Sequence, residues 1–251
     1  MALASIIYPI FSYFSEMKLL DLSSLEEPSL ACDVVIINSP VPAGATELLS
    51  RLAPDGQIVC ADGGADRLAC SLVEALDRDV QVVGDLDSVT EDGLKQLGER
   101  CRSVRVTRDG DESRCDLEKS LGLLSGSRLV LVLGDMTGRM DQVLSMFHCA
   151  FRTRCTVVCI GSSNVAFVVQ EGETRVTFPK SLLGAYCGYF PFFGKTKVST
   201  RGLKYDVANL EFEFGSFVSS SNEVDQPEVF IEASAALLFT VSFQGGSVDL
   251  L

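Results

Sequence analysis

From Asp33 to about Gly161, short apolar runs rich in β-branched residues alternate with amphipathic stretches. This alternation predicts strands joined by crossover helices in a parallel sheet. Most of the runs are apolar without interruption, which is typical of strands covered on both faces. We therefore expect six strands, at residues 34–37, 57–61, 80–83, 103–107, 128–133 and 156–160.

Two helix starts are indicated by the capping-box spacing, in which a Ser or Thr is followed three residues later by an acidic residue. Ser88 precedes Glu91 at this spacing, and Ser113 precedes Asp116. The side chains of such a pair satisfy free N–H groups in the first helical turn. Helices are therefore predicted to begin just after two acidic stretches.

After Gly161 the hydrophobic pattern changes to a period of two. Residues 174–178, 210–214 and 229–233 alternate or run apolar, with Gly and Pro between them. This predicts an antiparallel β-sandwich with its own core. The expected fold class is α/β, with an N-terminal parallel-sheet α/β domain followed by a C-terminal antiparallel β-sandwich domain. We assign residues 1–32 to an N-terminal extension, 33–165 to the α/β domain and 166–251 to the β-sandwich domain.

The N-terminal run from Ala2 to Phe14 is apolar but too short to span a bilayer. It lacks basic residues at its start, and Glu16 and Lys18 follow it in place of the small residues of a signal-cleavage site. We expect a helix packed on the body of the protein, with a targeting role as the alternative.

Composition narrows the classes of function. The 251 residues include 21 basic and 34 acidic ones, a net charge of −13, so nucleic acid is not an expected partner. The single histidine, His148, excludes sites that need two imidazoles, and its apolar neighbours predict a position in the core. The nine cysteines form no Cys-x-x-Cys pair, which favours a reducing cytoplasm over a disulfide framework or a zinc site.

Polar residues gather directly after four of the predicted strands. In an open parallel sheet the carboxyl ends of the strands lie along one edge, where ligands of such folds bind. Four segments that are distant in sequence are therefore expected to meet in one crevice. They are residues 61–65 (Ala-Asp-Gly-Gly-Ala), 84–88 (Gly-Asp-Leu-Asp-Ser), 109–119 (beginning Asp-Gly-Asp-Glu-Ser) and 134–141 (Gly-Asp-Met-Thr-Gly-Arg-Met-Asp).

This crevice combines groups that attract phosphate with groups that repel it. Gly63 and Gly64 let the backbone approach a phosphate closely, and the helix N-termini offer free N–H groups. The aspartates would repel a polyphosphate by several kcal/mol at an effective dielectric of about 20. A divalent cation removes the conflict. Asp85 and Asp87 lie two residues apart, so on an extended segment both project from one face, which suits Mg²⁺.

Each motif alone has a simpler interpretation. Asp-Gly-Gly is commonly a turn, and a strand-end aspartate often caps the next helix. Asp116 with Lys119 fits a surface ion pair, and Arg139 with Asp141 fits a solvated turn. The placement of all of them at four strand ends favours a phosphate site, in which Lys119 and Arg139 supply positive charge to a transferring group.

At these residues the sequence resembles the thiamine pyrophosphokinase family. Gly84–Ser88 matches the family's Gly-Asp-x-Asp-Ser motif, and Gly138–Asp141 matches its Gly-Arg-x-Asp motif. The resemblance keeps the family's order and spacing over about residues 33–245. The other similar segments are the glycine turn at 61–65, the Thr-Asp-x-x-Lys counterpart at 115–119, and two segments of the thiamine side at 202–205 and 214–222.

The chain departs from the family pattern at a few positions. Where the family has Asp-Gln-Asp-x-Thr-Asp, Glu112 and Ser113 stand in place of the Gln and the second Asp. Tyr205 stands where the family often has Trp, and the chain has no Trp. The departures at Glu112 and Ser113 affect the role expected of the acidic loop. The departure at Tyr205 affects the expected stacking of an aromatic ring on thiamine.

The resemblance implies a thiamine diphosphokinase, a transferase that moves a diphosphate from ATP to the hydroxyethyl group of thiamine and releases AMP, in the biosynthesis of thiamine diphosphate. Positioning and charge neutralisation are what such a transfer needs. Catalytic roles are implied for Asp87, Asp116, Lys119 and Arg139, and Mg²⁺ ligation for Asp85, Asp87 and Asp116. ATP would be bound by Asp62, Gly63, Gly64, Asp85, Lys119, Arg139 and Asp141, and thiamine by Glu112, Asp116, Tyr205, Ser219, Ser221 and Asn222.

The resemblance also implies a cytoplasmic homodimer, with thiamine bound between the α/β domain of one subunit and the β domain of the other. The sequence offers a physical motive in residues 229–243. Ala233–Val241 is apolar but for Ser234 and Thr240, so we expect it to need cover beyond a small sandwich.

Three other functions fit parts of the pattern. Residues 83–89 resemble the nucleophile motif of Mg²⁺-dependent haloacid dehalogenase-type phosphatases, although that motif normally ends the first strand of its domain and here follows the third. Asp85-Leu86-Asp87 also fits a Mn²⁺-dependent glycosyltransferase. A non-catalytic thiamine- or nucleotide-binding homologue is the alternative from another class, motivated by Ser113 and Thr137.

Overall fold

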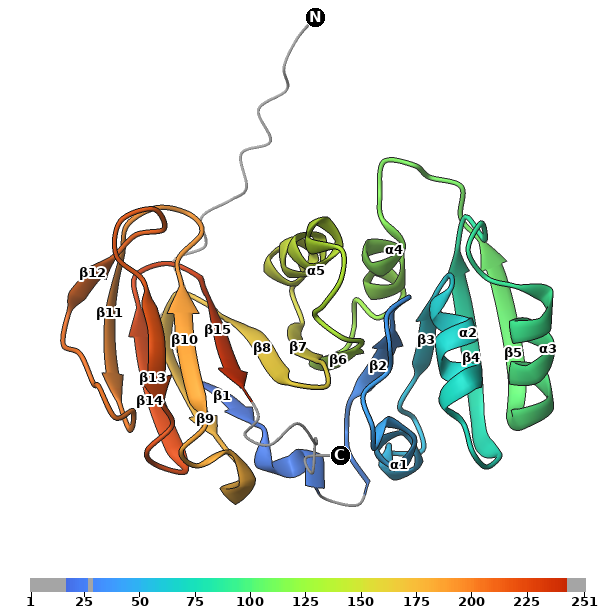
Figure 1. Ribbon diagram of the computed structural model, residues 1–251, viewed down its shortest axis with the longest axis horizontal. Helices are drawn as coiled ribbons and strands as arrows, with labels where there is room; N and C mark the ends of the chain where they lie inside the picture. The colour runs from blue at the N-terminus through green and yellow to red at the C-terminus, as the bar shows by residue number, and fades with distance from the viewer. Residues whose placement is uncertain (1–16, 27–28, 243–251) are drawn as a thin grey trace, which may run out of the picture.

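The computed structural model describes residues 17–26 and 29–242, and Figure 1 shows an elongated molecule built on two β-sheets. The helix expected over Ala2–Phe14 lies outside the described residues. None of the helices in the described ranges is long and apolar enough to cross a membrane.

The larger sheet has ten strands and runs the length of the molecule (Figure 1). Its parallel strands are β2 (Asp33–Ile36), β3 (Ile58–Ala61), β4 (Leu76–Gly84), β5 (Cys101–Arg108), β6 (Leu129–Leu133) and β7 (Thr156–Ile160). Its antiparallel strands are β8 (Asn164–Val169), β10 (Tyr186–Phe190), β13 (Ser219–Glu223) and β15 (Leu237–Ser242). The strand order is β13-β10-β15-β8-β7-β6-β2-β3-β4-β5.

The six predicted strands of the α/β half are confirmed. The apolar run at Thr156–Ile160 coincides with β7 from end to end, and the central strands are buried throughout. The largest difference is in β4, which begins at Leu76 because Asp77–Asp79 continue the strand despite their charge. An apolar run therefore locates a strand well but misses a charged end.

Helices cover both faces of the parallel part of the sheet. Val34 and Ile36 of β2 pack into one hydrophobic cluster and Val35 into another, as alternation along a strand requires. α1 (Ala45–Arg51), α2 (Gly64–Ser71) and α3 (Glu91–Arg100) contribute Leu48, Leu68 and Leu97 to the first cluster. α4 (Asp116–Leu123) and α5 (Met140–Arg152) contribute Leu117 and Met146 to the second.

The helix starts follow the two acidic stretches as predicted, but the predicted capping residues are wrong. Thr90 caps α3, since its Oγ1 accepts a hydrogen bond from the Gly93 N–H at 2.9 Å. The hydroxyls of Ser88 and Ser113 instead donate to neighbouring aspartates, at 2.8 and 2.6 Å. These hydroxyls thus act as donors within their own loops, and the free N–H of Gly93 is satisfied by Thr90, which lies nearer to the helix start.

The smaller sheet packs on the antiparallel end of the larger one and forms the predicted β-sandwich. Tyr189 of β10 contacts Phe212 across the two sheets, with ring centroids 4.9 Å apart. Phe178 directly follows β9 of the smaller sheet, and its ring centroid lies 6.4 Å from that of Phe239 in β15. The smaller sheet has the order β1-β9-β14-β11-β12 and comprises β1 (Lys18–Asp21), β9 (Gly172–Thr177), β11 (Thr196–Arg201), β12 (Leu210–Phe212) and β14 (Glu228–Ala233).

Two features cross the divisions drawn from the sequence. β1 comes from the region assigned to the N-terminal extension, yet it pairs in parallel with β9 of the sandwich. The larger sheet passes from its parallel to its antiparallel part at β7 and β8, which are hydrogen-bonded neighbours. One continuous sheet therefore belongs to both halves of the molecule. Two short 3₁₀ helices, Ser23–Glu26 and Lys180–Leu182, lie in the connections.

Two expectations about burial are wrong. β15 lies between β8 and β10, and its side chains Phe239 and Val241 are fully buried within the single chain. The apolar run there needs no second subunit, because Phe239 and Val241 pack in the first hydrophobic cluster with residues of the smaller sheet and Leu238 packs in the second cluster. His148 is exposed on α5, since the buried face of that helix is formed by Met146, Cys149 and Ala150.

Candidate active site

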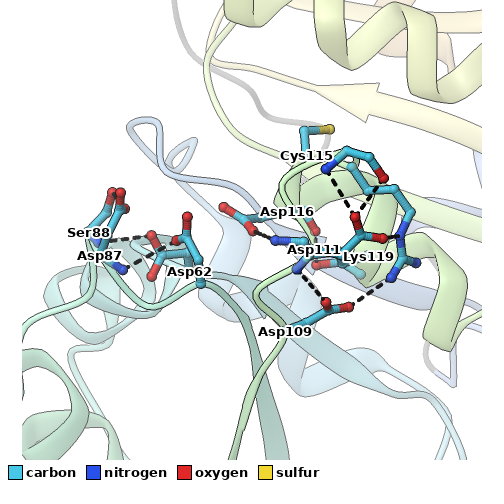
Figure 2. Close-up of polar contacts among 12 residues, drawn as sticks. Asp62, Asp87, Ser88, Asp109, Asp111, Cys115, Asp116 and Lys119 are labelled. Atoms are coloured by element: carbon cyan, nitrogen blue, oxygen red, sulfur yellow. Dashed lines mark hydrogen bonds and ion pairs between the residues drawn. The ribbon is translucent and has the colours of Figure 1, made fainter.

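The four predicted loops do lie at one edge of the sheet, because β3, β4, β5 and β6 are all parallel and the loops follow their carboxyl ends. In the view of Figure 2, Asp62 and Asp87 lie on one side of Asp116, and Asp109 and Asp111 lie on the other side. The loop after β6 ends where α5 begins, at Met140. The arrangement converges as the sequence predicts.

Asp62 lies at the centre of this edge. Its backbone is left-handed, with φ of 44°, and its carboxylate is buried at 3% residue exposure. The two oxygens accept hydrogen bonds from the N–H groups of Ser88 (3.0 Å) and Val89 (3.2 Å), so Asp62 ties the loop after β4 to the end of β3 (Figure 2). Burial raises the pKa of Asp62, although these hydrogen bonds act in the opposite direction.

Asp62, Asp85 and Asp87 form a group that we call the carboxylate cluster. Each offers an oxygen, and these three oxygens lie within 4.8 Å of one another. The turn that carries Asp85 and Asp87 has Leu86 between them in a left-handed conformation, with φ of 63°. In the described chain, no cation lies within ion-pair distance of any of the three. Three hard oxygen donors with no protein cation suit Mg²⁺ well.

Asp116 lies next to this cluster and is paired with Lys119. The Lys119 ammonium is almost fully buried and donates to Asp116 Oδ1 at 2.9 Å. Burial acts to lower the pKa of Lys119, but the hydrogen bond to Asp116 and the surrounding carboxylates raise it overall. Lys119 is therefore a permanent positive charge beside the cluster. A Cβ on Gly84 would lie 3.1 Å from Asp116 Oδ1, so a glycine there lets α4 approach β4 closely.

The loop after β5, residues 109–115, neutralises its own carboxylates, and we call it the Arg114 loop. Arg114 Nε donates to Asp111 at 2.7 Å, and its other end donates to Asp109 at 2.9 Å. The Ser113 side chain also donates to Asp111. The hydrogen bonds from Ser113 and Arg114 lower the pKa of Asp111 to about 2. Glu112 is exposed on the same loop.

Arg139 and Asp141 form an exposed fork at the start of α5. Arg139 Nε donates to Asp141 Oδ1 at 3.1 Å, and a second guanidinium nitrogen donates to the other oxygen. The hydrogen bonds raise the pKa of Arg139 and lower that of Asp141. Both side chains are more than 60% exposed, so the guanidinium can exchange this partner for a phosphate with little rearrangement.

The glycine turn after β3 is packed against β2. A Cβ on Gly64 would lie 2.2 Å from the backbone oxygen of Ile36, and one on Gly63 would lie 2.4 Å from the Asn38 side chain. Only glycine allows this approach, so the turn presents its N–H groups at the start of α2. Asn38, which also accepts a hydrogen bond from Arg67 at 3.0 Å, is a site residue that the sequence analysis missed. The feature of the sequence that could have identified Asn38 is its place as the polar residue directly after the apolar run of β2.

The predicted thiamine-side residues lie elsewhere, on β13 and in the loop before β12. Asn222 is buried, and its amide both accepts from the Tyr205 N–H and donates to the Tyr205 carbonyl, each at 3.0 Å. These two bonds hold the Tyr205 backbone, while the residue as a whole is 60% exposed. Ser221 is left-handed, with φ of 64°, and is exposed, whereas Ser219 is partly buried beside Tyr189. This strand presents hydroxyls at the edge of the larger sheet.

Together, this crevice and its fold define an α/β protein whose candidate active site lies at the carboxyl edge of a parallel sheet, where ligands of such folds bind. Two family models match the chain. "Thiamin pyrophosphokinase, catalytic domain" matches residues 52–160, and "Thiamin pyrophosphokinase, vitamin B1 binding domain" matches residues 173–238. The chain belongs to the thiamin pyrophosphokinase family.

Known relatives agree with this assignment. The chain is 29% identical over 175 residues to thiamin pyrophosphokinase 1 from Caenorhabditis elegans, which covers 65% of this chain and 70% of the relative. It is 25% identical over 241 residues to thiamine pyrophosphokinase 1 from Oryza sativa subsp. japonica, covering 87% and 90%. The fold is similar to that of a solved thiamin pyrophosphokinase from Candida albicans, with a TM-score of 0.79, 19% identity and 95% of each chain covered.

Proposed function

We propose that this protein transfers a diphosphate from ATP to the hydroxyethyl oxygen of thiamine and releases AMP. The observation that carries the proposal is that one chain matches both the catalytic and the vitamin B1 binding parts of the family. The carboxylate cluster lies within the first of these parts. The alternatives considered from sequence, a phosphatase, a glycosyltransferase and a non-catalytic homologue, are not favoured by these matches.

In this reaction the thiamine hydroxyl oxygen bonds to the β-phosphorus of ATP, the bond from that phosphorus to the α,β-bridging oxygen breaks, and the hydroxyl proton is released. The chain's contribution is binding and charge. The N–H groups at Gly63 and Gly64 donate hydrogen bonds to phosphate oxygens. Lys119, held by Asp116, and Arg139 neutralise charge on the transferring diphosphate. Asp116 is also suited to orienting the attacking hydroxyl.

The carboxylate cluster fits Mg²⁺, because it gathers three oxygen donors and, in the described chain, no protein cation lies within ion-pair distance of them, the nearby Lys119 being paired with Asp116. Asp85 and Asp87 would hold the cation together with Asp62. The pair with Lys119 keeps Asp116 adjacent, as the further ligand that the family resemblance implies. When bound, Mg²⁺ offsets the negative charge of the phosphates. Asp62 also fixes the loop carrying Asp85 and Asp87 through its bonds to backbone N–H groups.

The proposed activity is tested by incubating the protein with ATP, MgCl₂ and thiamine and separating AMP and thiamine diphosphate by chromatography. We expect both products in equal amounts and neither when thiamine is omitted. Inorganic phosphate in place of AMP would indicate a phosphatase. Binding of thiamine and ATP without AMP would indicate a non-catalytic homologue.

We further propose a homodimer that shares its sites between subunits. In support of this, β13 and β4 are separated by seven strands of the larger sheet. At about 4.8 Å per strand this is roughly 40 Å along the sheet, far more than an ATP molecule can bridge. Figure 1 shows β13 and β4 toward opposite ends of the molecule. A second copy would supply the missing half of each site.

Exposed aromatic side chains give this proposal a physical motive that replaces the apolar run of β15. Phe192 stacks on Phe214 with centroids 5.1 Å apart, and Phe193 meets Phe151 of α5 at 5.0 Å. Phe193 and Phe214 are 67% and 59% exposed. A patch of this kind between the sandwich loops and α5 is typical of a surface that a partner subunit covers.

Subunit mixing tests the shared site. Asp116→Ala and the double variant Ser219→Ala/Ser221→Ala should each be nearly inactive alone. After subunit exchange, random pairing should restore up to about one site in four. No recovery, with exchange confirmed by native mass spectrometry of differently tagged subunits, would show that each site lies within one chain.

A cytoplasmic location is also proposed. All nine cysteines are free thiols, which is typical of proteins in a reducing compartment.

A further inference from the structure

Two cysteines that the proposed reaction does not use lie against each other beside the candidate active site. Cys115 is the residue immediately before α4, and Cys149 lies in the middle of α5. Their sulfur atoms are 3.4 Å apart. Cys115 is exposed and stands beside Asp116 in Figure 2, whereas Cys149 is buried.

This geometry differs from that of ordinary buried thiols. A disulfide bond is about 2.05 Å long, so the two sulfurs need to approach by only about 1.4 Å. One thiol is open to a small oxidant and the other lies directly behind it, which is the arrangement of an attacked and a resolving cysteine. Ser145, one turn before Cys149, directs its hydroxyl at Cys115 Sγ from 3.9 Å. Two side chains of α5 thus contact the sulfur of Cys115.

We propose that Cys115 and Cys149 form a reversible disulfide when the protein meets a peroxide. The Cys115 sulfur attacks one peroxide oxygen, the O–O bond breaks, and Cys115 becomes a sulfenic acid with release of water. The Cys149 sulfur then attacks the Cys115 sulfur, the S–O bond breaks, and a second water leaves. For hydrogen peroxide, two thiols and one H₂O₂ give one disulfide and two H₂O, so the sulfurs lose two electrons and the peroxide gains them.

The disulfide would regulate the site because Cys115 is bonded to Asp116. Drawing Cys115 toward α5 shifts the first residue of α4, and with it the carboxylate that holds Lys119 at 2.9 Å. A displacement of about 1 Å at a positioned group is enough to lower a rate by up to about a hundredfold. This effect on activity rests on the proposed function, whereas formation of the disulfide does not.

Peptide masses test the modification without any assay of activity. The full-length protein is treated with a small excess of hydrogen peroxide, its remaining thiols are blocked with N-ethylmaleimide, and it is digested with trypsin without reduction. Cleavage after Arg114, Lys119, Arg139 and Arg152 isolates the two cysteines on separate peptides. We expect residues 115–119 joined to residues 140–152, two hydrogens lighter than the sum, and the two free peptides again after dithiothreitol.

Two variants control this experiment. Cys149→Ser, or Cys149→Ala should the serine variant not fold, should leave Cys115 as a sulfenic acid that reacts with dimedone and should give no joined peptide. Cys70→Ser, at the other exposed cysteine, should behave as the wild type. The proposal is overturned if Cys115 and Cys149 are each recovered with N-ethylmaleimide, or if Cys115 joins Cys70 of another chain instead.

The activity arm uses the same samples. Oxidation of the wild type should lower the rate of AMP release about tenfold or more, with recovery after dithiothreitol. A joined peptide with unchanged AMP release would overturn the regulatory claim and leave the modification standing. Absence of AMP release before oxidation would instead refute the proposed function, so the two failures are distinguishable.

Discussion

The carboxylate cluster and the Arg114 loop are neighbouring acidic regions that follow β3, β4 and β5, but their charges are satisfied differently. In the Arg114 loop, one guanidinium joins Asp109 and Asp111. In the carboxylate cluster, Asp62 is buried and accepts from the neutral groups of Ser88 and Val89. The pKa values also differ: hydrogen bonds from Ser113 and Arg114 lower that of Asp111 to about 2, while burial raises that of Asp62.

The difference separates carboxylates that are structurally satisfied from those left for a ligand. A paired aspartate gains little from an added cation, because a protein cation already neutralises it. In an unpaired and partly buried group of aspartates, desolvation and mutual repulsion of the carboxylates are unfavourable, and a bound cation reduces this cost. Acidic composition alone therefore does not identify a metal site. The presence or absence of an internal arginine distinguishes the two regions.

The largest expected effect comes from removing one charge of the carboxylate cluster. Asp85→Asn or Asp87→Asn should lower kcat at least about a hundredfold at saturating Mg²⁺, since each removes a charged oxygen from the cation site. The Tm should change by less than about 2 °C, because neither side chain is in the core. The matched control is Asp77→Asn, at a 91% exposed aspartate of β4. Near-normal kcat in both cluster variants would make these aspartates structural.

Arg139 sharpens the comparison because it is paired with Asp141 much as Arg114 is paired with Asp111. If pairing alone decided function, Arg139 would be as dispensable as a surface ion pair. We expect instead that Arg139→Lys lowers kcat/KM for ATP about tenfold or more, since lysine keeps the charge but loses the planar fork. Arg152→Lys, at an arginine paired with Glu118 at 3.2 Å, is the control. Wild-type kinetics for Arg139→Lys would show that Arg139 belongs to a solvated turn and does not bind ATP.

The glycine turn beside Asp62 is packed more tightly than the Arg114 loop. This difference predicts a smaller effect, on the free energy of unfolding. Gly64→Ala places a methyl group against the Ile36 backbone oxygen, so it should lower the free energy of unfolding by about 1–3 kcal/mol. Gly110→Ala in the Arg114 loop has open space around it and should stay within about 0.5 kcal/mol of the wild type. Urea denaturation measures both. Equal stabilities would mean that the turn after β3 relaxes freely.

The smallest expected effect concerns the pH dependence of the Arg114 loop. The folded-state pKa of Asp111, about 2, lies below its unfolded value of about 3.9, so its stabilisation is present above pH 4 and disappears as the pH falls through 2. Arg114→Ala should therefore lower the Tm at pH 7 by at most about 2 °C, and this difference should vanish near pH 2. Calorimetry across this range checks it, and a deficit independent of pH would show that packing rather than charge is responsible.

Local patterns predict much of the α/β half but not how the halves join. The strand at Thr156–Ile160 is readable because five consecutive residues favour a strand, and Asp85 and Asp87 were located because they follow one. The third member of the carboxylate cluster was not identified as such, because a buried left-handed Asp62 has no signature beyond Asp-Gly-Gly. The place of β15 and the outward direction of His148 depend on pairings and packing made far along the chain.

The parallel pairing of β1 with β9 has a consequence for how the chain folds during synthesis. Lys18 donates from Nζ to the backbone oxygen of Glu171, 153 positions further along. A ribosome therefore releases the first described strand long before its partner exists, and contacts that close such long loops form slowly. Among the described strands, the earliest to be synthesised is therefore among the last to find its place, so its edge stays open to chaperones or to other chains until the sandwich is complete.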